Sequence, residues 1–213
     1  MKENADQYKE TFETWDKVAK LYQEKFMDLD LFNDTYDRFC DLLKKEATVL
    51  EIGCGPGNTT RYLLRKRPDL SIHGIDKSPN MIALAKANNP AAHFSVMDAR
   101  EIGQMKEAYD AIISGFCLPY LSEEDVSIMF RDARKLLKEN GILYISFVPA
   151  DKSESEFVTG STGDRTYFYF HTIAFISGEL KRNGFEMMHQ FDKIYRRENG
   201  TEESNTILIA KGN

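Results

Sequence analysis

The sequence predicts an α/β fold with a mostly parallel sheet and helices on both of its faces. Short apolar runs typical of buried strands alternate with helix-like segments through the middle of the chain. One of these runs leads into a glycine-rich segment and then into a helix, as in nucleotide-binding folds. The chain has 213 residues, of which 42% are hydrophobic, so we expect a single domain over residues 1–213 with its own core.

Residues 1–46 are expected to form a helical cap. A mostly aromatic set recurs there at spacings of three and four: Phe12, Trp15, Ala19, Tyr22 and Phe26. These spacings place the set on one face of a helix. That face either packs on the core or serves as a lid that closes over a substrate. A second helix is expected to follow, with Asn33 as its N-cap.

Five apolar runs are expected to form the parallel strands: Thr48–Ile52, Ser71–Ile75, His93–Met97, Tyr109–Ser114 and Ile142–Val148. Helices between them carry start signals at Ser78 and Ser122, because a serine hydroxyl can accept a hydrogen bond from a free N–H group of the first turn. Asn140 and Gly141 are expected to end the helix that Ser122 opens.

Residues 149–213 are expected to form the substrate side and the end of the sheet. The polar segment after Val148 interrupts the regular order of elements and predicts a surface excursion near the site. The elements expected after it are a helix from Ile173 to Asn183 capped by Gly184, and an antiparallel hairpin of Phe185–Tyr195 and Ser204–Lys211 around Asn199 and Gly200.

The glycine-rich segment after the first strand carries most of the functional information. It reads Glu51-Ile52-Gly53-Cys54-Gly55-Pro56-Gly57, and its glycines let a ligand approach the backbone closely. The Glu51 carboxylate would repel the pyrophosphate of a dinucleotide and attract the sulfonium and ammonium groups of S-adenosylmethionine. A nearby Arg or Lys that pairs with Glu51 is the alternative. Asn58 stands where a GxGxxG motif would have its third glycine.

Two further carboxylates stand at the ends of the next strands. Asp76 comes 21 residues after Gly55, where this architecture places an acid that accepts hydrogen bonds from both ribose hydroxyls. Asp98 follows the third strand, where a carboxylate can accept a hydrogen bond from the adenine amino group. Either acid could instead simply turn the chain.

With these motifs in place, residues 48–148 resemble the class I S-adenosylmethionine-dependent methyltransferases, in the small-molecule branch of domain types 11, 12 and 25. The resemblance implies a Rossmann-like, seven-stranded sheet of order 3-2-1-4-5-7-6 whose seventh strand is antiparallel. It implies S-adenosylmethionine as cofactor, with S-adenosylhomocysteine as product, bound in a core of residues 47–148. The implied contacts are Glu51, Gly53, Cys54 and Gly55 to the methionine part, Asp76 to ribose, Lys77, Met81, Asp98 and Ala99 to adenine, and Gly115 and Phe116 at the sulfonium.

The residues expected near the methyl acceptor include aromatic side chains, but they form no motif that is specific for one kind of acceptor. Methyl transfer is an in-line displacement that needs mainly proximity and exclusion of water. If a general base assists, His171 is the candidate, and a structural histidine is the alternative. The candidate acceptor contacts are Trp15, Tyr22, Tyr120, Tyr167 and Tyr169, of which the last two could belong to an ordinary packed strand. We expect no metal site, because the histidines and cysteines lack metal-ligand spacing.

The net charge of -6 disfavours nucleic acid as a partner, because nucleic-acid binders concentrate Lys and Arg. We therefore expect a small-molecule acceptor and a monomer or homodimer. Three cysteines scattered over the sequence and a polar N-terminus predict a cytoplasmic protein without a membrane segment. The alternatives are a non-catalytic S-adenosylmethionine-binding module and a NAD-dependent oxidoreductase, which Glu51 and Asn58 disfavour.

Overall fold

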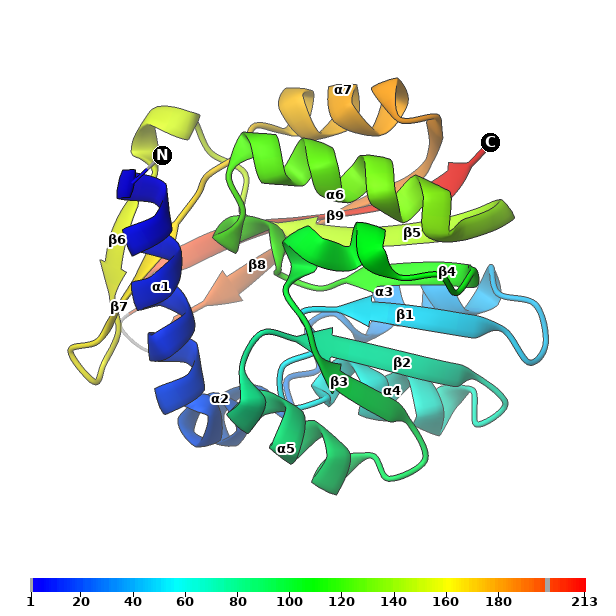
Figure 1. The fold of residues 1–213 in the computed structure, drawn as a ribbon, viewed down its shortest axis with the longest axis horizontal. Helices are drawn as coiled ribbons and strands as arrows, with labels where there is room; N and C mark the ends of the chain where they lie inside the picture. The colour runs from blue at the N-terminus through cyan, green and yellow to red at the C-terminus, as the bar shows by residue number, and fades with distance from the viewer. Residues whose placement is uncertain (1, 198–199) are drawn as a thin grey trace.

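The computed structural model describes residues 2–197 and 200–213, and its main feature is a seven-stranded sheet with helices on both faces (Figure 1). The elements up to the fourth strand are α1 (Lys2–Lys17), α2 (Ala19–Phe26), α3 (Asn33–Asp41), β1 (Thr48–Ile52), α4 (Asn58–Lys66), β2 (Ser71–Asp76), α5 (Pro79–Asn88), β3 (His93–Val96), the 3₁₀-helix η1 (Ala99–Gln104) and β4 (Tyr109–Ser114). The elements after it are η2 (Leu118–Tyr120), α6 (Glu123–Leu136), β5 (Leu137–Phe147), η3 (Lys152–Glu154), β6 (Glu156–Thr159), β7 (Arg165–Phe168), α7 (Ile173–Arg182), β8 (Phe185–Arg196) and β9 (Glu202–Gly212).

The strand order of the main sheet is β3-β2-β1-β4-β5-β9-β8. Strands β1 to β5 run parallel to one another, and β9 runs antiparallel to both β5 and β8. Numbered within this sheet alone, the order is 3-2-1-4-5-7-6 with an antiparallel seventh strand, so the predicted topology is confirmed. Strands β6 and β7 form a separate two-stranded sheet that the sequence did not predict.

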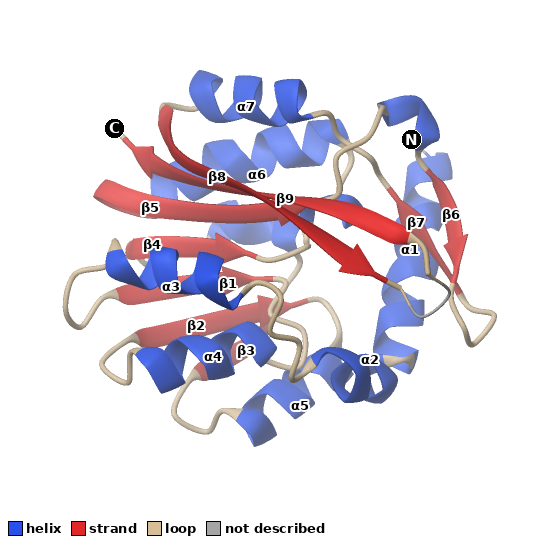
Figure 2. Ribbon diagram, turned by 180° about the vertical axis from the view of Figure 1, so that it is seen from behind, coloured by secondary structure: helices blue, strands red, loops and turns tan. Residues whose placement is uncertain are grey.

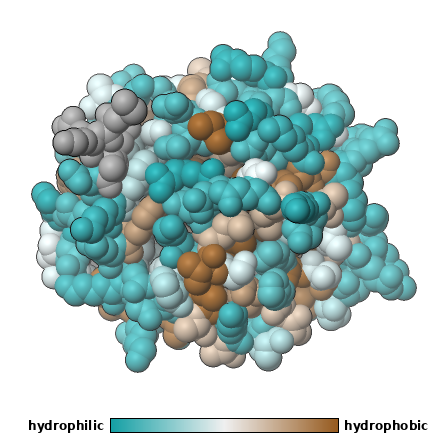
Figure 3. Space-filling model, in the orientation of Figure 1, coloured by the Kyte–Doolittle hydropathy of each residue, from teal (hydrophilic) through white to brown (hydrophobic). Residues whose placement is uncertain are grey.

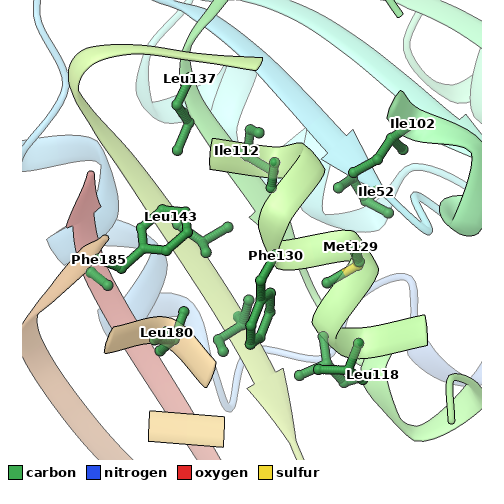
Figure 4. Close-up of a cluster of buried hydrophobic side chains, with 14 of the residues drawn as sticks. Ile52, Ile102, Ile112, Leu118, Met129, Phe130, Leu137, Leu143, Leu180 and Phe185 are labelled. Carbon is green, nitrogen blue, oxygen red and sulfur yellow. The ribbon is translucent and has the colours of Figure 1, made fainter. Parts of the chain in front are cut away.

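The two faces of the main sheet are covered by different helix pairs. Helices α3 and α4 lie on the face turned to the viewer in Figure 2, and α6 and α7 lie behind it. Along β1, Val49 packs into the cluster under α3 and α4, whereas Leu50 packs into the cluster under α6 and α7. Figure 4 shows the second cluster, where Phe130 of α6 and Leu180 of α7 lie next to Leu143 of β5. Burial of each such side chain contributes about 1.5–3 kcal/mol to folding.

The N-terminal aromatic set lies on two helices rather than on the single helix predicted. The backbone leaves the helical conformation at Val18, whose φ and ψ are -93° and 11°. The two helices differ in their tertiary contacts, because α1 packs mainly against β7 and also contacts α5, while α2 packs against α5. Trp15 and Tyr22 are therefore held by different helices.

Two predicted helix boundaries are wrong. Phe32, not Asn33, is the N-cap of α3, which begins at Asn33. Helix α6 ends at Leu136, four residues before Asn140, and passes straight into β5. Leu136 and Leu137 are both buried, and the change from helix to strand lets two consecutive side chains enter the core. Asn140 instead lies in an irregular part of β5, with a φ of 59°.

Other predicted boundaries are confirmed. Ser78 accepts a hydrogen bond from the backbone N–H of Met81, and Ser122 caps α6 in the same way. Gly184 follows α7 with a φ of 77°, and β8 and β9 form the predicted antiparallel hairpin. The predicted turn residue Asn199 lies outside the described residues.

The polar excursion after β5 folds back against the first helix. The backbone N–H of Tyr167 donates to Thr11 Oγ1 at 2.9 Å, and Thr14 Oγ1 donates to the carbonyl oxygen of Arg165 at 2.7 Å. Figure 1 shows α1 and β7 side by side, at the edge of the sheet where β1 and β2 end. We call α1, α2, β6 and β7 the cap. Among the described helices, none has the length and apolar character of a membrane span.

The surface seen in Figure 3 is mostly hydrophilic, with a few separate hydrophobic patches. Large exposed apolar side chains are few and come from different elements: Leu21, Val96, Val158, Met187, Met188 and Ile194. Single exposed apolar residues of this kind are usual for a folded protein.

Candidate functional site

The glycine loop between β1 and α4 lies at the carboxyl ends of the parallel strands. Strand β1 has β2 on one side and β4 on the other, so the chain order reverses there, and ligands of open α/β sheets bind at such a switch point. The N–H groups of Gly53 and Cys54 donate to the carbonyl oxygen of Ile75 at 2.8 and 2.9 Å. Gly53, Gly55 and Gly57 have φ values of 71°, 52° and 81°, which favour glycine.

Two asparagines at the end of α5 also hold the loop. Asn88 Nδ2 donates to the carbonyl oxygen of Pro56 at 2.8 Å, and Asn89 Nδ2 donates to that of Gly57 at 2.9 Å. Sequence reasoning missed both residues, because nothing local connects a helix end to a loop some 30 positions earlier. The loop is therefore fixed from β2 and from α5.

Glu51 is a buried carboxylate beside this loop. Its side chain is 3% exposed and accepts a hydrogen bond from the hydroxyl of Thr60. It forms no ion pair with any Lys or Arg of residues 2–197 and 200–213, so the predicted alternative of a paired structural acid does not hold for the described chain. Burial raises the pKa of Glu51 to about 8.

Asp76 ends β2 and connects the glycine loop to the start of α5. Its Oδ2 accepts a hydrogen bond from the N–H of Gly55 at 2.9 Å, and its Oδ1 accepts one from the N–H of Ser78 at 2.9 Å. Burial raises the pKa of Asp76, and its charge in turn acts to raise the pKa of Glu51. Two carboxyl groups thus share a site that lacks a cationic side chain among the residues described.

Asp98 differs from these two acids, because Arg100 pairs with it. Arg100 Nε and Nη2 donate to its two oxygens at 2.9 and 2.6 Å, and Lys77 Nζ lies 3.8 Å away. Burial acts to raise the pKa of Asp98, but the hydrogen bonds from Arg100 hold it below its ordinary value. Asp98 also accepts the backbone N–H of Arg100, and Ala99 then begins η1.

The other predicted cofactor contacts are spread around the loop. Cys54 and Met81 are buried in the packing between the loop, α5 and the sheet. Gly115 and Phe116 follow β4, as predicted. The N–H of Phe116 donates to Ser146 Oγ at 2.9 Å, and its ring lies 5.0 Å from that of Phe32. The Phe116 ring therefore packs toward α3.

Aromatic side chains of the cap and of η2 gather beside the glycine loop. The ring of Trp15 lies 5.5 Å from that of Tyr22 and 5.4 Å from that of Tyr120, and Tyr120 lies 5.8 Å from Phe168. A Cβ atom built on Gly55 would lie 3.7 Å from Tyr22 Cε1, so the Tyr22 ring rests on the loop. We call Trp15, Tyr22, Tyr120 and Phe168 the aromatic cluster.

Tyr167 and Tyr169 lie apart from this cluster. The Tyr167 hydroxyl donates to the carbonyl oxygen of Ser155 at 3.2 Å, and the Tyr169 hydroxyl donates to Gln7 Oε1 at 3.1 Å. Phe168, between them, contacts Tyr120 instead. Alternation along an extended strand puts residues 167 and 169 on one face and residue 168 on the other, a signal that could have identified Phe168.

His171 is buried at the base of η2. It is 1% exposed, and its Nε2 lies 3.2 and 3.0 Å from the carbonyl oxygens of Leu118 and Leu121. Burial lowers its pKa, which keeps the ring neutral. These contacts favour the structural alternative, since they hold the turn that carries Tyr120. Its role as a base remains a prediction.

Comparison with known proteins bears on this site. A family model described as a methyltransferase domain matches residues 49–141, which include the glycine loop, Asp76 and Asp98. Protein 235L of Invertebrate iridescent virus 6, named as a methyltransferase, is 38% identical over 109 residues, or 50% of this chain and 40% of that protein. Trans-aconitate 2-methyltransferase of Escherichia fergusonii is 38% identical over 97 residues, or 46% and 37% of the two chains.

The matched segment is about two fifths of the length of these relatives. Solved structures show the same fold over more of the chain. A SAM-dependent methyltransferase of Methanosarcina mazei has a TM-score of 0.71 at 18% identity and covers 82% of this chain and 96% of its own. Magnesium protoporphyrin IX methyltransferase of Synechocystis with bound SAM has a TM-score of 0.64 at 21% identity, covering 85% and 79%.

The same fold also occurs in a protein named for another reaction. The [4+2]-cyclase SpnF has a TM-score of 0.66 at 18% identity and covers 84% of this chain and 80% of its own. The fold alone therefore does not establish the reaction.

Proposed function

We propose that this chain, a member of the class I S-adenosylmethionine-dependent methyltransferases, transfers the methyl group of S-adenosylmethionine to a small-molecule acceptor. One observation carries the proposal. The buried carboxylate of Glu51 lies beside the glycine loop and has no cationic partner among the described residues. The ammonium and sulfonium groups of S-adenosylmethionine supply the missing charge, whereas a pyrophosphate would add to the repulsion.

The roles assigned to the loop residues follow from this orientation. The methionine part lies along Gly53, Cys54 and Gly55 with its ammonium group near Glu51. Asp76 accepts hydrogen bonds from the ribose hydroxyls with the lone pairs that the N–H groups of Gly55 and Ser78 leave free.

Adenine then lies toward the ends of β2 and β3. Lys77 and Met81 flank it there, and Asp98 and Ala99 contact its edge. Asp98 can accept a hydrogen bond from the adenine amino group without losing those from Arg100, because each carboxylate oxygen has two lone pairs.

The chain's contribution to the transfer step is mainly positional. A lone pair of the acceptor attacks the methyl carbon in line, and the carbon–sulfur bond breaks with its electrons moving to sulfur. Holding the reactants at attack distance supplies much of the rate, and the rings of the cap exclude water. We assign the cap the role of a lid, and Tyr22 the contact that closes it on Gly55.

Titration calorimetry with S-adenosylhomocysteine tests the cofactor assignment. We expect the wild type to bind and Glu51→Gln to bind at least tenfold more weakly, because a hydrogen bond to a charged group contributes about 1.5–3 kcal/mol. Glu179→Gln is the matched control. Glu179 is also 3% exposed, but it pairs with Arg182 in α7, so its loss leaves the affinity unchanged.

The outcomes separate the alternatives. Absence of binding by the wild type, or equal binding by Glu51→Gln, would overturn the cofactor assignment. Binding of NADH in place of S-adenosylhomocysteine would favour an oxidoreductase. Tight cofactor binding without product S-adenosylhomocysteine across a broad acceptor panel would make the chain a binding module or an enzyme of another reaction.

A further inference from the structure

The aromatic cluster lies where an acceptor must approach the cofactor. Its rings come from three parts of the chain, α1 and α2, η2, and β7, and Tyr22 rests on Gly55 of the glycine loop. Tyr120 follows the end of β4 by only six residues, at the strand that borders the switch point. These ring faces carry partial negative charge, which attracts cations and repels anions.

The arginines that lie over rings of the cap are each paired with an acid. Arg100 pairs with Asp98 and lies 4.0 Å from the ring centre of Tyr8, and Arg165 pairs with Glu10. Arg165 also lies 4.4 Å from the ring centre of Phe157. In the part of the chain that the structure describes, no Lys or Arg lies over a ring of the aromatic cluster. Other rings of the cap therefore bind arginine side chains on their faces, whereas the rings of the aromatic cluster have no such cation in the described chain.

The ionisable side chains beneath the cluster are acidic. Glu51 and Asp76 lie below it without cationic partners within residues 2–197 and 200–213. Arg197, on the hairpin near Tyr120, pairs with Glu203. An acceptor that bears carboxylates would lose its hydration and gain no cation in exchange. A cationic product would gain from the faces of the rings.

The groups around the cluster also limit the nucleophile. Burial raises the pKa of the Tyr22 and Tyr120 hydroxyls and raises that of the Cys117 thiol to about 12, so all three stay protonated near neutral pH. The Nε2 of His171 faces two backbone carbonyl groups. An alcohol would need a base to take its proton, whereas a neutral amine attacks with its own lone pair.

We infer that the acceptor is an amine whose methylated product is an organic cation held against the rings of Trp15, Tyr22, Tyr120 and Phe168. This inference rests on the proposed function and names its substrate class. The amine lone pair forms the new nitrogen–carbon bond, and the carbon–sulfur bond electrons move to sulfur, which becomes a neutral thioether. The nitrogen takes over the positive charge, and the product keeps it as an ammonium group.

Trp15 makes this testable, because it is the only tryptophan of the chain. Its fluorescence therefore reports on the aromatic cluster alone. The protein is saturated with S-adenosylhomocysteine and titrated with benzyltrimethylammonium or with phenylacetate, two probes that share a phenyl ring and differ in charge. We expect the ammonium to change the fluorescence with a dissociation constant at least tenfold lower than that of the carboxylate.

Variants of one ring separate charge recognition from packing. Tyr120→Phe keeps the ring face and should retain the ammonium affinity within about twofold, whereas Tyr120→Leu should lower it about 3- to 10-fold. Tyr62→Leu is the control, since Tyr62 lies in α4 outside the cluster, donates its hydroxyl to Asp37 and should leave the affinity unchanged when replaced.

Three results would overturn the inference: tighter binding of phenylacetate, no fluorescence response to the ammonium, or equal effects of Tyr120→Phe and Tyr120→Leu. The proposed function fails separately, because it requires only that S-adenosylhomocysteine binds in the preceding step. If the protein binds the cofactor but methylates a carboxylate, the inference of an amine acceptor is wrong and the proposed methyltransferase function still stands.

Discussion

Each end of the parallel sheet holds an acid that is partly or fully buried. The two acids differ in their partners, and their pKa values are shifted in opposite directions. At the amino end of β4, Asp110 pairs with Lys44 at 2.7 Å and with Lys138 at 3.0 Å, and it accepts the hydroxyl and N–H of Thr48. Burial acts to raise its pKa, but these partners hold it well below the ordinary value. At the carboxyl end of β1, Glu51 has neutral hydrogen-bond donors of Thr59 and Thr60 as partners, and burial raises its pKa to about 8.

The difference separates an acid that stabilises the fold from one that serves a ligand. Asp110 is satisfied by the chain itself, so its removal should cost stability. Glu51 is held at a cost to stability, and a cationic ligand relieves that cost. Each prediction below tests this contrast.

The largest effect is expected for Asp76→Asn, the second acid at the carboxyl end. Loss of its charge should weaken S-adenosylhomocysteine binding about 100-fold, because the ribose hydroxyls lose a charged acceptor and the loop loses one of its anchors. Calorimetry measures the change. Asp110→Asn is the same substitution at the other end of the sheet, and an equal loss of affinity there would remove the contrast.

The pH dependence of binding should follow Glu51. With a pKa of about 8, Glu51 is mostly protonated in the free protein at pH 7, and a cationic ligand binds its ionised form. Binding therefore releases a proton, and affinity should rise up to about tenfold per pH unit between pH 6 and 8. Calorimetry at several pH values measures this slope. Glu51→Gln should flatten it, and a flat profile for the wild type would contradict the raised pKa.

Asp110→Asn should lower the free energy of unfolding by about 1–3 kcal/mol, because both lysines lose their shared carboxylate. The folded pKa lies below the unfolded one, so this stabilisation is present above about pH 4 and is lost as the pH falls further. Urea denaturation at pH 7 and in a series down to pH 2 measures both effects. A difference between variant and wild type that stays constant from pH 7 to pH 2 would argue against the ion pairs as its source.

The smallest effect is expected for Thr60→Val, which keeps the shape of the side chain and removes the hydroxyl that donates to Glu51. The carboxylate then becomes harder to ionise, so S-adenosylhomocysteine should bind about 3-fold more weakly at pH 7. Raising the pH to 9 should bring the affinity of the variant close to that of the wild type in a calorimetric titration. A loss that does not depend on pH would mean that Thr60 acts through packing instead.

Local sequence patterns were sufficient for the sheet and the loop. Apolar runs located β1 to β5, and the glycines with Glu51 located the switch point, because strand burial and loop conformation depend on neighbouring residues. The terminal hairpin was predicted for the same reason. The partners of Glu51 could not be read from the sequence, since only the fold shows which side chains surround a buried acid.

The failures came from contacts between distant segments. The break at Val18 accompanies the packing of α1 against β7 and α5 and of α2 against α5, and no periodicity in the first 26 residues contains that information. The ion pair of Asp98 with Arg100 could not be predicted, because a spacing of two residues leaves open whether the side chains turn toward each other. The contact of Phe168 with Tyr120 depends on which face of β7 turns toward η2, and that is set by the fold.

A crystal structure of the complex with S-adenosylhomocysteine tests the central claim most directly. The account predicts the amino group of the ligand within hydrogen-bond reach of Glu51, the ribose hydroxyls on Asp76 and the adenine beside Asp98, with the sulfur facing the aromatic cluster. A ligand bound elsewhere, or one whose amino group points away from a still-protonated Glu51, would contradict it.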